Sequence, residues 1–314
     1  MTVGEIIYHF YHKPVGMTKN VLKIGIRKTV EIKRGKKKMI EASRHLREIR
    51  YNGIDQHNVY FLTGKKYWYQ TAFCLYSLQL RAGMNIHATV LDDGSFDDEL
   101  EADVNKQFPT TVTVIRTDRL NRLLDEKLPK DRFPELRNRR LVYPHLRKLT
   151  DIHVLPSRLP KLVLDSDMLF FQKPNELLDW LSNPSRLLFM RDVKESYGYT
   201  RALMKKLAVA DVIPERLNVG IAGIPSDKIN WQRLEQWTGE LLRQEGSSYL
   251  QEQALTAMLA ANHPVQFLDE RDYKVLPLIK NGQVDEVLHH YVADSKYDYF
   301  VKGWKIVFDS YRNA

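Results

Sequence analysis

The chain has a single cysteine, Cys74, among its 314 residues. An internal disulfide is therefore excluded, and a reducing compartment is predicted. The chain also lacks any uninterrupted apolar run of about 18 residues, which argues against a membrane-spanning helix. Its first residues, MTVGEIIYHFYHKP, lack the basic start and long apolar stretch of a signal peptide. We therefore expect a cytoplasmic protein, and neither a disulfide scaffold nor an integral membrane protein nor a typical secreted enzyme.

Several motifs of common enzyme classes are missing as well. The sequence has no Gly-x-Gly-x-x-Gly and no Walker-type glycine–lysine loop, which argues against a dinucleotide enzyme and a P-loop NTPase. It has no His-Glu-x-x-His, no Gly-x-Ser-x-Gly and no pair of cysteines. Zinc proteases of that type and hydrolases with a nucleophile elbow are therefore disfavoured.

The basic excess is confined to the N-terminal segment. Residues 1–50 hold 13 Lys and Arg and 4 Glu, which accounts for the whole net charge of +9, and the rest of the chain is balanced. The densest run, at 33–38, fits a solvated face or mobile arm, an anionic membrane patch or a nucleic-acid patch. Nucleic acid is disfavoured because no aromatic residue interleaves the run. From the turn dipeptide Asn52-Gly53 we predict an accessory segment at 1–50, which could contact an anionic membrane at its inner face, and a catalytic domain at 51–314.

Short apolar runs alternate with helical periodicity from residue 57 onward. We predict strands at 57–62, 85–91, 111–115 and 161–164, and helices at 66–81, capped by Gly83, and at 96–108. This alternation predicts an α/β fold with a mostly parallel sheet and helices on both faces. Ligands bind beyond the carboxyl ends of such strands, so chemistry is expected at Thr63-Gly64 and near Asp92-Asp93.

The most informative stretch is Asp165-Ser166-Asp167, which interrupts two apolar runs at 161–164 and 168–171. We interpret it as a buried strand with two carboxylates on one side of its end. Such close like charges repel unless a cation lies between them, and a divalent metal is the simplest one. A surface turn with capping aspartates is the structural alternative. The haloacid-dehalogenase phosphatases share an Asp-x-Asp strand end, but there Thr or Val follows after one residue, where this chain has Met168-Leu169 at mid-chain.

Near the C-terminus, apolar runs at 274–279 and 284–291 flank Asn281-Gly282. Asn-Gly between apolar runs predicts a small C-terminal β-hairpin. His289 and His290 then lie at a strand end and point to opposite faces. Lys296 follows His290 by six residues and could reach a phosphate if His290 reaches the metal, although a packing role is the alternative for a single histidine.

Together these motifs resemble the GT-A-fold glycosyltransferases, most closely the retaining family of glycogenin and bacterial lipo-oligosaccharide galactosyltransferases. The resemblance covers residues 58–296. VYFLTG (59–64) is similar to the family's opening nucleotide-binding strand, and Lys148 precedes Asp-x-Asp at the family's spacing. Further along, LNVGIAGI (217–224) resembles the family's Phe-Asn-x-Gly-Val segment, and YLQEQALTAML (249–259) resembles its acidic-Gln pair. HYVADSK (290–296) matches the family's His-x5-Lys ending. Ala293 stands where the family usually has Gly, Glu252 where it often has Asp, and Tyr297-Asp298 replace the usual Pro-Trp.

The resemblance implies a Rossmann-like GT-A domain that moves a hexose from a nucleotide-diphosphate sugar, UDP-sugar by analogy, with retention. The acceptor could be a glycan, a lipid-linked molecule or a protein. The implied metal ligands are Asp165, Asp167 and His290, and an imidazole beside two carboxylates suits Mn²⁺ better than Mg²⁺. The implied donor contacts are Thr63, Lys148, Asp165, Gly220, Gln253 and Lys296.

Asn218 and Glu252 are the implied catalytic residues. Glu252 lies on the inward face of its predicted helix, where it could accept sugar hydroxyls or lie near the anomeric carbon, and we do not assign it as a nucleophile. Structural roles are the alternative for each, a turn for Asn218 and a favourable helix-dipole position for Glu252. Two other functions stay open, a sugar-nucleotide nucleotidyltransferase and a non-catalytic binding protein of the same fold. The first is disfavoured because Thr63-Gly64-Lys65-Lys66 holds one glycine where that class has a Gly-rich loop.

Overall fold

The computed structural model describes residues 25–53, 56–157 and 159–312. Residues 1–24 of the predicted accessory segment lie outside the described residues. Within the described part of the chain, no helix combines the length and the apolar character needed to cross a membrane.

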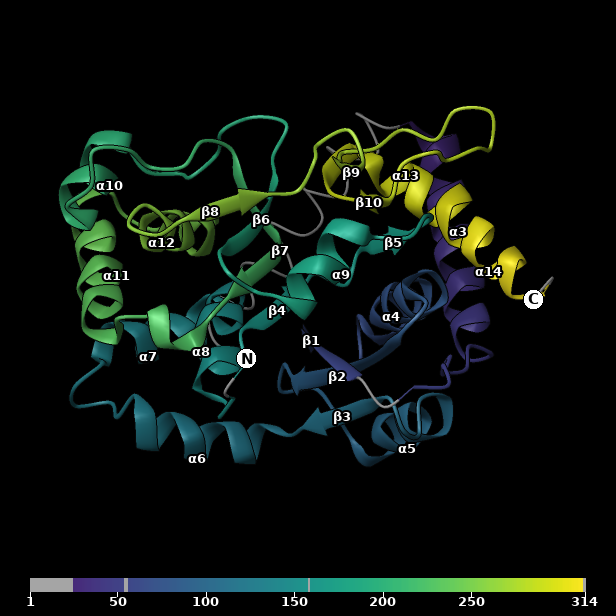
Figure 1. Cartoon of the computed structure of the whole chain (residues 1–314), viewed down its shortest axis with the longest axis horizontal. Coiled ribbons are helices and arrows are strands. Elements are labelled where there is room, and N and C mark those ends of the chain that lie inside the picture. Colours follow the sequence, from purple (N-terminus) through teal and green to yellow (C-terminus); the bar gives the residue numbers. More distant parts are fainter. Residues whose placement is uncertain (1–24, 54–55, 158, 313–314) are drawn as a thin grey trace.

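A seven-stranded sheet forms the centre of the fold, in the order β3-β2-β1-β4-β7-β6-β8 (Figure 1). Neighbouring strands are parallel except in the two pairs that include β7. β1 and β2 pair in register from Gln56↔Asn85 to Thr63↔Asp92, so both strands end at the same edge. The strands are β1 Gln56–Thr63, β2 Asn85–Asp92, β3 Val112–Ile115, β4 Lys161–Leu164, β6 Leu187–Arg191, β7 Leu217–Ile224 and β8 Val265–Phe267.

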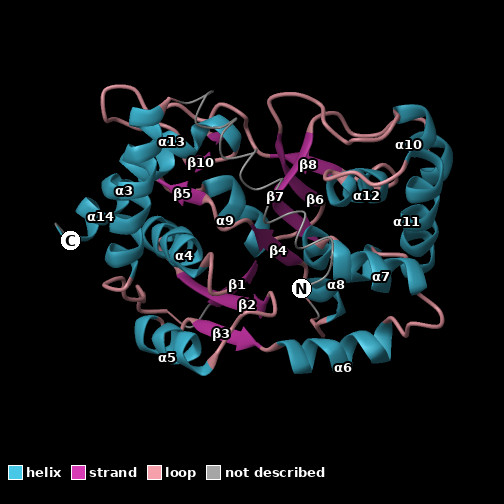
Figure 2. Ribbon diagram, turned by 180° about the vertical axis from the view of Figure 1, so that it is seen from behind, coloured by secondary structure: helices cyan, strands magenta, loops and turns pink. Residues whose placement is uncertain are grey.

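Helices cover both faces of this sheet (Figure 2). Side chains alternate along β1, so Val59 and Phe61 join one apolar core and Tyr60 joins the other. The first core is completed by α3 Ile26–Ser43, α4 Trp68–Ala82, α5 Asp98–Gln107, α9 Asn175–Ser182 and α14 Trp304–Arg312. The second is completed by α6 Thr117–Lys127, α7 Pro134–Val142, α8 Arg147–Val154, α10 Arg201–Ala208, α11 Trp231–Glu245 and α12 Gln251–Ala260.

The predicted α/β class and the mostly parallel sheet are confirmed, and the early elements lie close to their predicted bounds. Gly83 ends α4 in the left-handed conformation (φ 67°) that glycine adopts without strain. The helix predicted to begin at residue 96 begins two residues later, because the Asp97 side chain caps it by accepting a hydrogen bond from the Leu100 N–H at 2.9 Å.

The apolar run after Asp167 does not continue β4. It forms β5 Met168–Phe170, which belongs to a second sheet in the order β5-β10-β9, with β9 Tyr273–Val275 and β10 Leu288–His290. The last ladder bond of β4 joins the Asp165 N–H to the Gly220 carbonyl at 2.8 Å, and the chain then turns. This turn keeps both carboxylates out of a buried strand, where unpaired charge is costly.

The predicted C-terminal β-hairpin is wrong. β9 and β10 pair in parallel, and the Asn281-Gly282 turn closes only a single bridge, Lys280↔Gln283. Leu276 leaves β9 in a left-handed conformation (φ 55°), and Pro277 has no N–H to donate to a ladder. The local turn signal was therefore correct, but β10 pairs with the distant β5 and with β9 in the other direction.

The basic helix α3 packs against the rest of the molecule. Met39 and Leu46 have no exposed surface and belong to the first core. α3 lies beside α14, so the two ends of the described chain meet at one side of the molecule (Figures 1 and 2). The domain boundary after residue 50 stays a prediction, and within the described residues α3 shares its core with the domain that follows.

Candidate functional site

Three residues from distant parts of the chain meet at the carboxyl end of β4. The Nε2 atom of His290 lies 3.3 Å from an oxygen of Asp167 and 3.6 Å from an oxygen of Asp165. One ligand atom from each lies within 4.8 Å of the others. We call these residues the carboxylate–histidine cluster. The structure therefore brings together the three residues named as metal ligands from the sequence.

The backbone around the cluster is fixed by both sheets. The Asp165 N–H bonds to β7, and the Asp167 carbonyl accepts a hydrogen bond from the Tyr291 N–H at 2.9 Å, just after β10. Between the aspartates, the Ser166 hydroxyl lies 2.8 Å from the Thr71 hydroxyl of α4. The two carboxylates thus sit on a turn that three elements hold in place.

His290 is the most unusual member of the cluster. It is 2% exposed, and neither of its ring nitrogens has a hydrogen-bond partner among the described residues. Its neighbour His289 is equally buried but has partners at both nitrogens, the Tyr291 hydroxyl at 3.0 Å and the Glu286 carboxylate at 3.2 Å. Buried polar atoms are nearly always satisfied, so the free nitrogens of His290 point to a group that binds them.

Gly220 makes room for this imidazole. A Cβ atom built on Gly220 would lie 2.4 Å from the Cε1 atom and 2.5 Å from the Nδ1 atom of His290. A side chain at this position would therefore displace the histidine. The family-implied donor contact at Gly220 stays a prediction, while the structure gives the glycine a clear role in placing His290.

Two lysines flank the carboxylates. Lys148 of α8 donates to Asp165 at 2.9 Å and to the Val219 carbonyl at 3.4 Å, and Lys296 donates to Asp167. Burial raises the pKa of the Asp167 carboxyl, but Lys296 and the neighbouring His290 outweigh burial and hold that pKa well below its usual range. Lys296 therefore helps to keep the Asp167 carboxylate negatively charged at neutral pH.

Glu252 lies on the other side of Lys148. Its carboxylate is 3.4 Å from the Lys148 Nζ atom, and the side chain is buried. Burial raises the pKa of Glu252 to about 7, with Lys148 opposing the shift and Asp165 adding to it. A carboxyl group with such a pKa can exchange a proton near neutral pH.

Residues of α7 and the turn after it position the helix that carries Glu252. The Tyr143 hydroxyl lies 3.4 Å from the backbone nitrogen of Glu252, and Arg139 donates to the Gln251 side chain at 2.5 Å. The Arg139 guanidinium also stacks on the Tyr143 ring, 4.6 Å from its centroid. These contacts fix the first turn of α12 beside the cluster.

The other predicted residues are buried near the same edge. The Asn218 side chain accepts a hydrogen bond from the Gly220 N–H at 2.9 Å and donates to the Asp192 carboxylate at 3.2 Å. The Thr63 hydroxyl accepts a hydrogen bond from Thr71 at 2.8 Å, and Gln253 donates to the Ser196 carbonyl at 3.0 Å. Their roles in catalysis or donor binding stay predictions.

Ala293, between His290 and Lys296, has a left-handed backbone (φ 43°). The conformation is the one that glycine favours, and glycine is what the resembling family usually has there. An alanine in this conformation carries local strain.

A groove lies at the same edge of the sheet, and none of the residues of the cluster lines it. It has a volume of about 810 Å³, and its walls include Arg191 at the end of β6, Asp192 directly after it, Arg216 before β7, and Leu276 after β9. Two hydrogen bonds connect the groove to residues in or next to the cluster. Asp192, on one wall, accepts a hydrogen bond from Asn218. The Leu276 N–H, on another wall, donates to the His290 carbonyl at 3.2 Å. Arg216, Leu276 and Asn281 line this groove with left-handed backbones, a kind of strain that clusters at functional sites.

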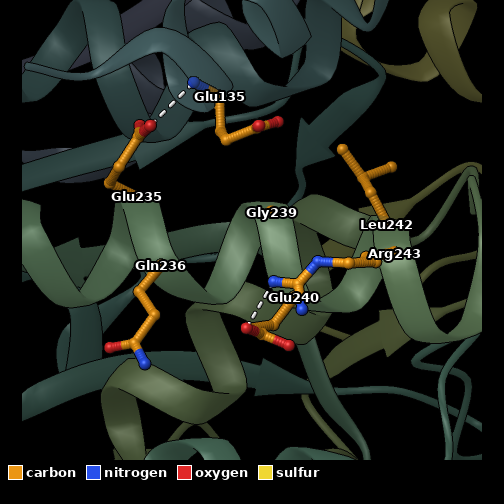
Figure 3. Close-up of a pocket in the computed structure, with 7 residues that line it drawn as sticks. All are labelled: Glu135, Glu235, Gln236, Gly239, Glu240, Leu242 and Arg243. Carbon is orange, nitrogen blue, oxygen red and sulfur yellow. Dashed lines mark hydrogen bonds and ion pairs between the residues drawn. The ribbon is translucent and has the colours of Figure 1, made fainter.

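A separate hollow of about 490 Å³ lies between α7 and α11 (Figure 3). The Glu235 carboxylate accepts hydrogen bonds from the backbone N–H groups of Glu135 at 2.7 Å and Leu136 at 2.9 Å, which caps the N-terminus of α7. Arg243 pairs with Glu240 on α11 itself. These contacts stabilise a helix–helix junction, and none of the residues of the cluster lines this hollow.

Sequence reasoning missed Asp192 and Tyr143. Asp192 follows the apolar run of β6 directly, so the strand-end argument used for Asp165 would have found it. Tyr143 carries no such signal, because its position depends on how α7 packs against α12.

No family model matches the chain, and no curated protein matches it in sequence. Solved structures match its fold. The galactosyltransferase LgtC in complex with donor and acceptor sugar analogs is 14% identical with a TM-score of 0.52, and the match covers 81% of this chain and 95% of that one. Mouse xyloside xylosyltransferase 1 is 12% identical with a TM-score of 0.51, covering 75% and 97%. The WbbM bifunctional glycosyltransferase is 13% identical with a TM-score of 0.50, covering 84% and 53%.

At these identities the likeness defines the fold. The chain has a GT-A glycosyltransferase fold that resembles LgtC, as the motifs predicted. The carboxylate–histidine cluster lies at the edge of this fold where α/β sheets bind ligands.

Proposed function

We propose that the protein is a metal-dependent glycosyltransferase that takes a hexose from a nucleotide-diphosphate sugar, UDP-sugar by family resemblance, and transfers it with retention. The observation that carries the proposal is the buried imidazole of His290, whose Nε2 atom faces two carboxylates and has no hydrogen-bond partner among the described residues. Lys148 and Lys296 already pair with the carboxylates, but the buried Nε2 atom of His290 lacks a partner, and buried polar atoms are rarely left so.

The residues present fit a divalent metal. Two carboxylates and one imidazole would hold it, and this mixed donor set suits Mn²⁺ better than Mg²⁺. When bound, the ion supplies positive charge that offsets the charge growing on a departing diphosphate. Lys148 and Lys296, which lie against the carboxylates, can donate hydrogen bonds to the same phosphates.

Glu252 and Asn218 are the proposed catalytic residues. The pKa of Glu252, raised to about 7, lets its carboxyl accept or donate a hydrogen bond to a sugar hydroxyl near neutral pH. Asn218 connects Gly220, which lies beside His290, to Asp192 on the groove wall through its two hydrogen bonds. Thr63 and Gln253 are proposed donor contacts from the family resemblance alone.

The acceptor is proposed to bind in the groove of about 810 Å³ beside the cluster. Its lining is mostly charged and polar, and the planar Arg191 guanidinium stacks on the Phe267 ring, 4.0 Å from its centroid, with its N–H edge available to hydroxyl groups. A glycan, free or linked to a lipid or protein, matches that chemistry. A cytoplasmic location is part of the proposal and rests on the single cysteine.

Turnover of nucleotide sugars tests the proposal. With Mn²⁺ present, the wild-type protein should release UDP from UDP-glucose or UDP-galactose slowly even without an acceptor, and Asp167→Asn should abolish the release. Formation of UDP-sugar from UTP and a sugar 1-phosphate would instead indicate a nucleotidyltransferase. Tight UDP binding without any turnover of a panel of nucleotide sugars would indicate a non-catalytic binding protein.

A further inference from the structure

The helix α3 is held against the molecule by its inward face. A Cβ atom built on Gly35 would lie 2.0 Å from the Phe300 carbonyl oxygen, so the two backbones are in direct contact. Met39, one turn further, is fully buried. The Tyr297 hydroxyl donates to Glu31 at 2.6 Å. The orientation of α3 about its own axis is therefore fixed, and so is the face that it turns to solvent.

That outward face follows a helical spacing of three and four residues. Its members are exposed, and they are Ile26, Val30, Lys33, Arg34, Lys37, Lys38 and Glu41. Lys305 of α14 is also exposed and lines one groove with Arg34, Lys37 and Lys38. We call these seven residues of α3, together with Lys305, the α3 face.

Within the described part of the chain, no ion pair neutralises the basic residues of the α3 face. No ion-pair partner among the described residues contacts the five basic residues of this face, which are Lys33, Arg34, Lys37, Lys38 and Lys305. Glu41 is the exposed carboxylate of the same face, and Glu31 is already engaged by Tyr297 and by Arg27 at 3.1 Å. Five cations face one carboxylate, so the surface favours an anionic partner.

We propose that the α3 face docks the protein on the surface of an anionic lipid bilayer. Basic side chains are attracted to anionic headgroups, and aliphatic side chains beside them can enter the headgroup boundary. Ile26 is 74% exposed and Val30 38% exposed at one end of the basic stripe. No aromatic residue lies within the stripe to stack on bases, which disfavours a single-stranded nucleic acid. The docking is independent of the proposed activity.

Vesicle co-sedimentation of the full-length chain tests the proposal. The protein should pellet with vesicles of phosphatidylcholine that contain about one third phosphatidylglycerol, and should stay in the supernatant with phosphatidylcholine alone. Reversing the stripe with Lys33→Glu, Arg34→Glu, Lys37→Glu and Lys38→Glu should lower the partition coefficient at least about tenfold. All four positions are exposed, so the thermal midpoint should be retained.

A matched variant separates local docking from net charge. Arg119→Glu, Arg122→Glu, Lys127→Glu and Lys130→Glu change the net charge equally at exposed positions on and just after α6. This variant should bind vesicles as the wild type does, whereas equal losses in both variants would overturn the proposal. Wild-type protein that ignores the anionic vesicles would overturn it as well.

The aliphatic pair distinguishes a bilayer from a general polyanion. Ile26→Ser with Val30→Ser should weaken vesicle binding about threefold or more. If this pair has no effect and a duplex oligonucleotide binds as tightly as the vesicles, the surface recognises nucleic acid and the lipid proposal fails. UDP–Mn²⁺ binding measured on every variant should be unchanged, so this outcome and the outcome for the proposed activity can be told apart.

Discussion

Two buried lysines lie at opposite ends of β4, and the charges around them differ. Lys148 approaches the carboxyl end, where its Nζ atom is 2.9 Å from Asp165 and 3.4 Å from Glu252. Lys161 is the first residue of the strand, and it donates to the Leu155 carbonyl at 2.6 Å beside the Tyr60 ring. One lysine has two carboxylates, and the other has a neutral carbonyl and an aromatic face.

Their acid–base behaviour differs accordingly. Burial, and then the nearby charge of Lys127, lower the pKa of Lys161 to about 7. Burial also disfavours the charged form of Lys148, but Asp165 and Glu252 outweigh it and raise that pKa above its usual value. Carboxylates thus stabilise the charged form of Lys148 but not that of Lys161, and one of them, Asp165, also faces His290. The arrangement of charges therefore favours the binding of charged ligands at the carboxyl end of β4.

Replacing each lysine by methionine should separate the two ends most clearly. Lys148→Met leaves Asp165 and Glu252 without their cation, so the free energy of unfolding should fall by about 3–5 kcal/mol. Lys161→Met removes a lysine that loses its charge readily, so the free energy of unfolding should stay level or rise by about 1–2 kcal/mol. Urea unfolding at pH 7 measures both.

Ligand binding provides the control for that pair. Lys148→Met should weaken UDP–Mn²⁺ binding, while Lys161→Met should leave it within about twofold of the wild type. Equal destabilisation by both substitutions, or a loss of UDP–Mn²⁺ binding in Lys161→Met, would show that the two ends do not differ as described.

The amino end of β4 should make the protein sensitive to acid through His153. Burial, and then the charge of Lys161, lower the pKa of His153 to about 3. The unfolded chain, with a histidine pKa of about 6.5, binds a proton that the folded protein does not, so stability is lost as the pH falls below about 6.5. Between pH 6.5 and about 4.5 this loss should reach roughly 2–3 kcal/mol.

His153→Gln is the comparison for this effect, because glutamine can keep the hydrogen bond to Ser226, which lies 3.0 Å from the His153 Nδ1 atom. Unfolding curves at several pH values should show a shallower acid slope for the variant. Parallel slopes in the two proteins would mean that the acid sensitivity arises elsewhere.

The smallest expected effect is at Ala293, on the functional side of the molecule. Ala293→Gly should relieve the left-handed strain and raise the free energy of unfolding by about 0.5–1 kcal/mol. UDP–Mn²⁺ binding should be kept, because the turn between His290 and Lys296 is already in this conformation. A loss of stability on substitution would indicate that alanine is not strained there.

Local patterns allowed much of the fold to be predicted from the sequence. Alternating apolar runs located β1 and β2, and Gly83 marked the end of α4, because each depends on a few neighbouring residues. The C-terminal hairpin failed for the opposite reason. Asn281-Gly282 does turn the chain, but the partner of β10 is β5, more than a hundred residues away in sequence, and no local signal encodes that pairing.

The residues of the candidate site also divide into those that local sequence patterns reveal and those that depend on long-range packing. Asp165 and Asp167 were visible as a strand end, and His290 was placed beside them by the family resemblance. The six-residue spacing to Lys296 already favoured His290 over His289, and the structure adds that His289 has partners whereas His290 has none among the described residues. The positioning by Tyr143 and Arg139 could not be predicted, because it arises from packing between α7 and α12.

Calorimetric titration of Mn²⁺ into the UDP-saturated protein tests the central claim most directly. The wild type should bind one Mn²⁺, His290→Ala should weaken that binding about 10–100-fold, and His289→Ala should stay within about threefold of the wild type. Each variant's thermal midpoint without metal serves as the folding control. No Mn²⁺ binding by the wild type, equal losses in the two variants, or a larger loss in His289→Ala would contradict the assignment of the carboxylate–histidine cluster as a metal site.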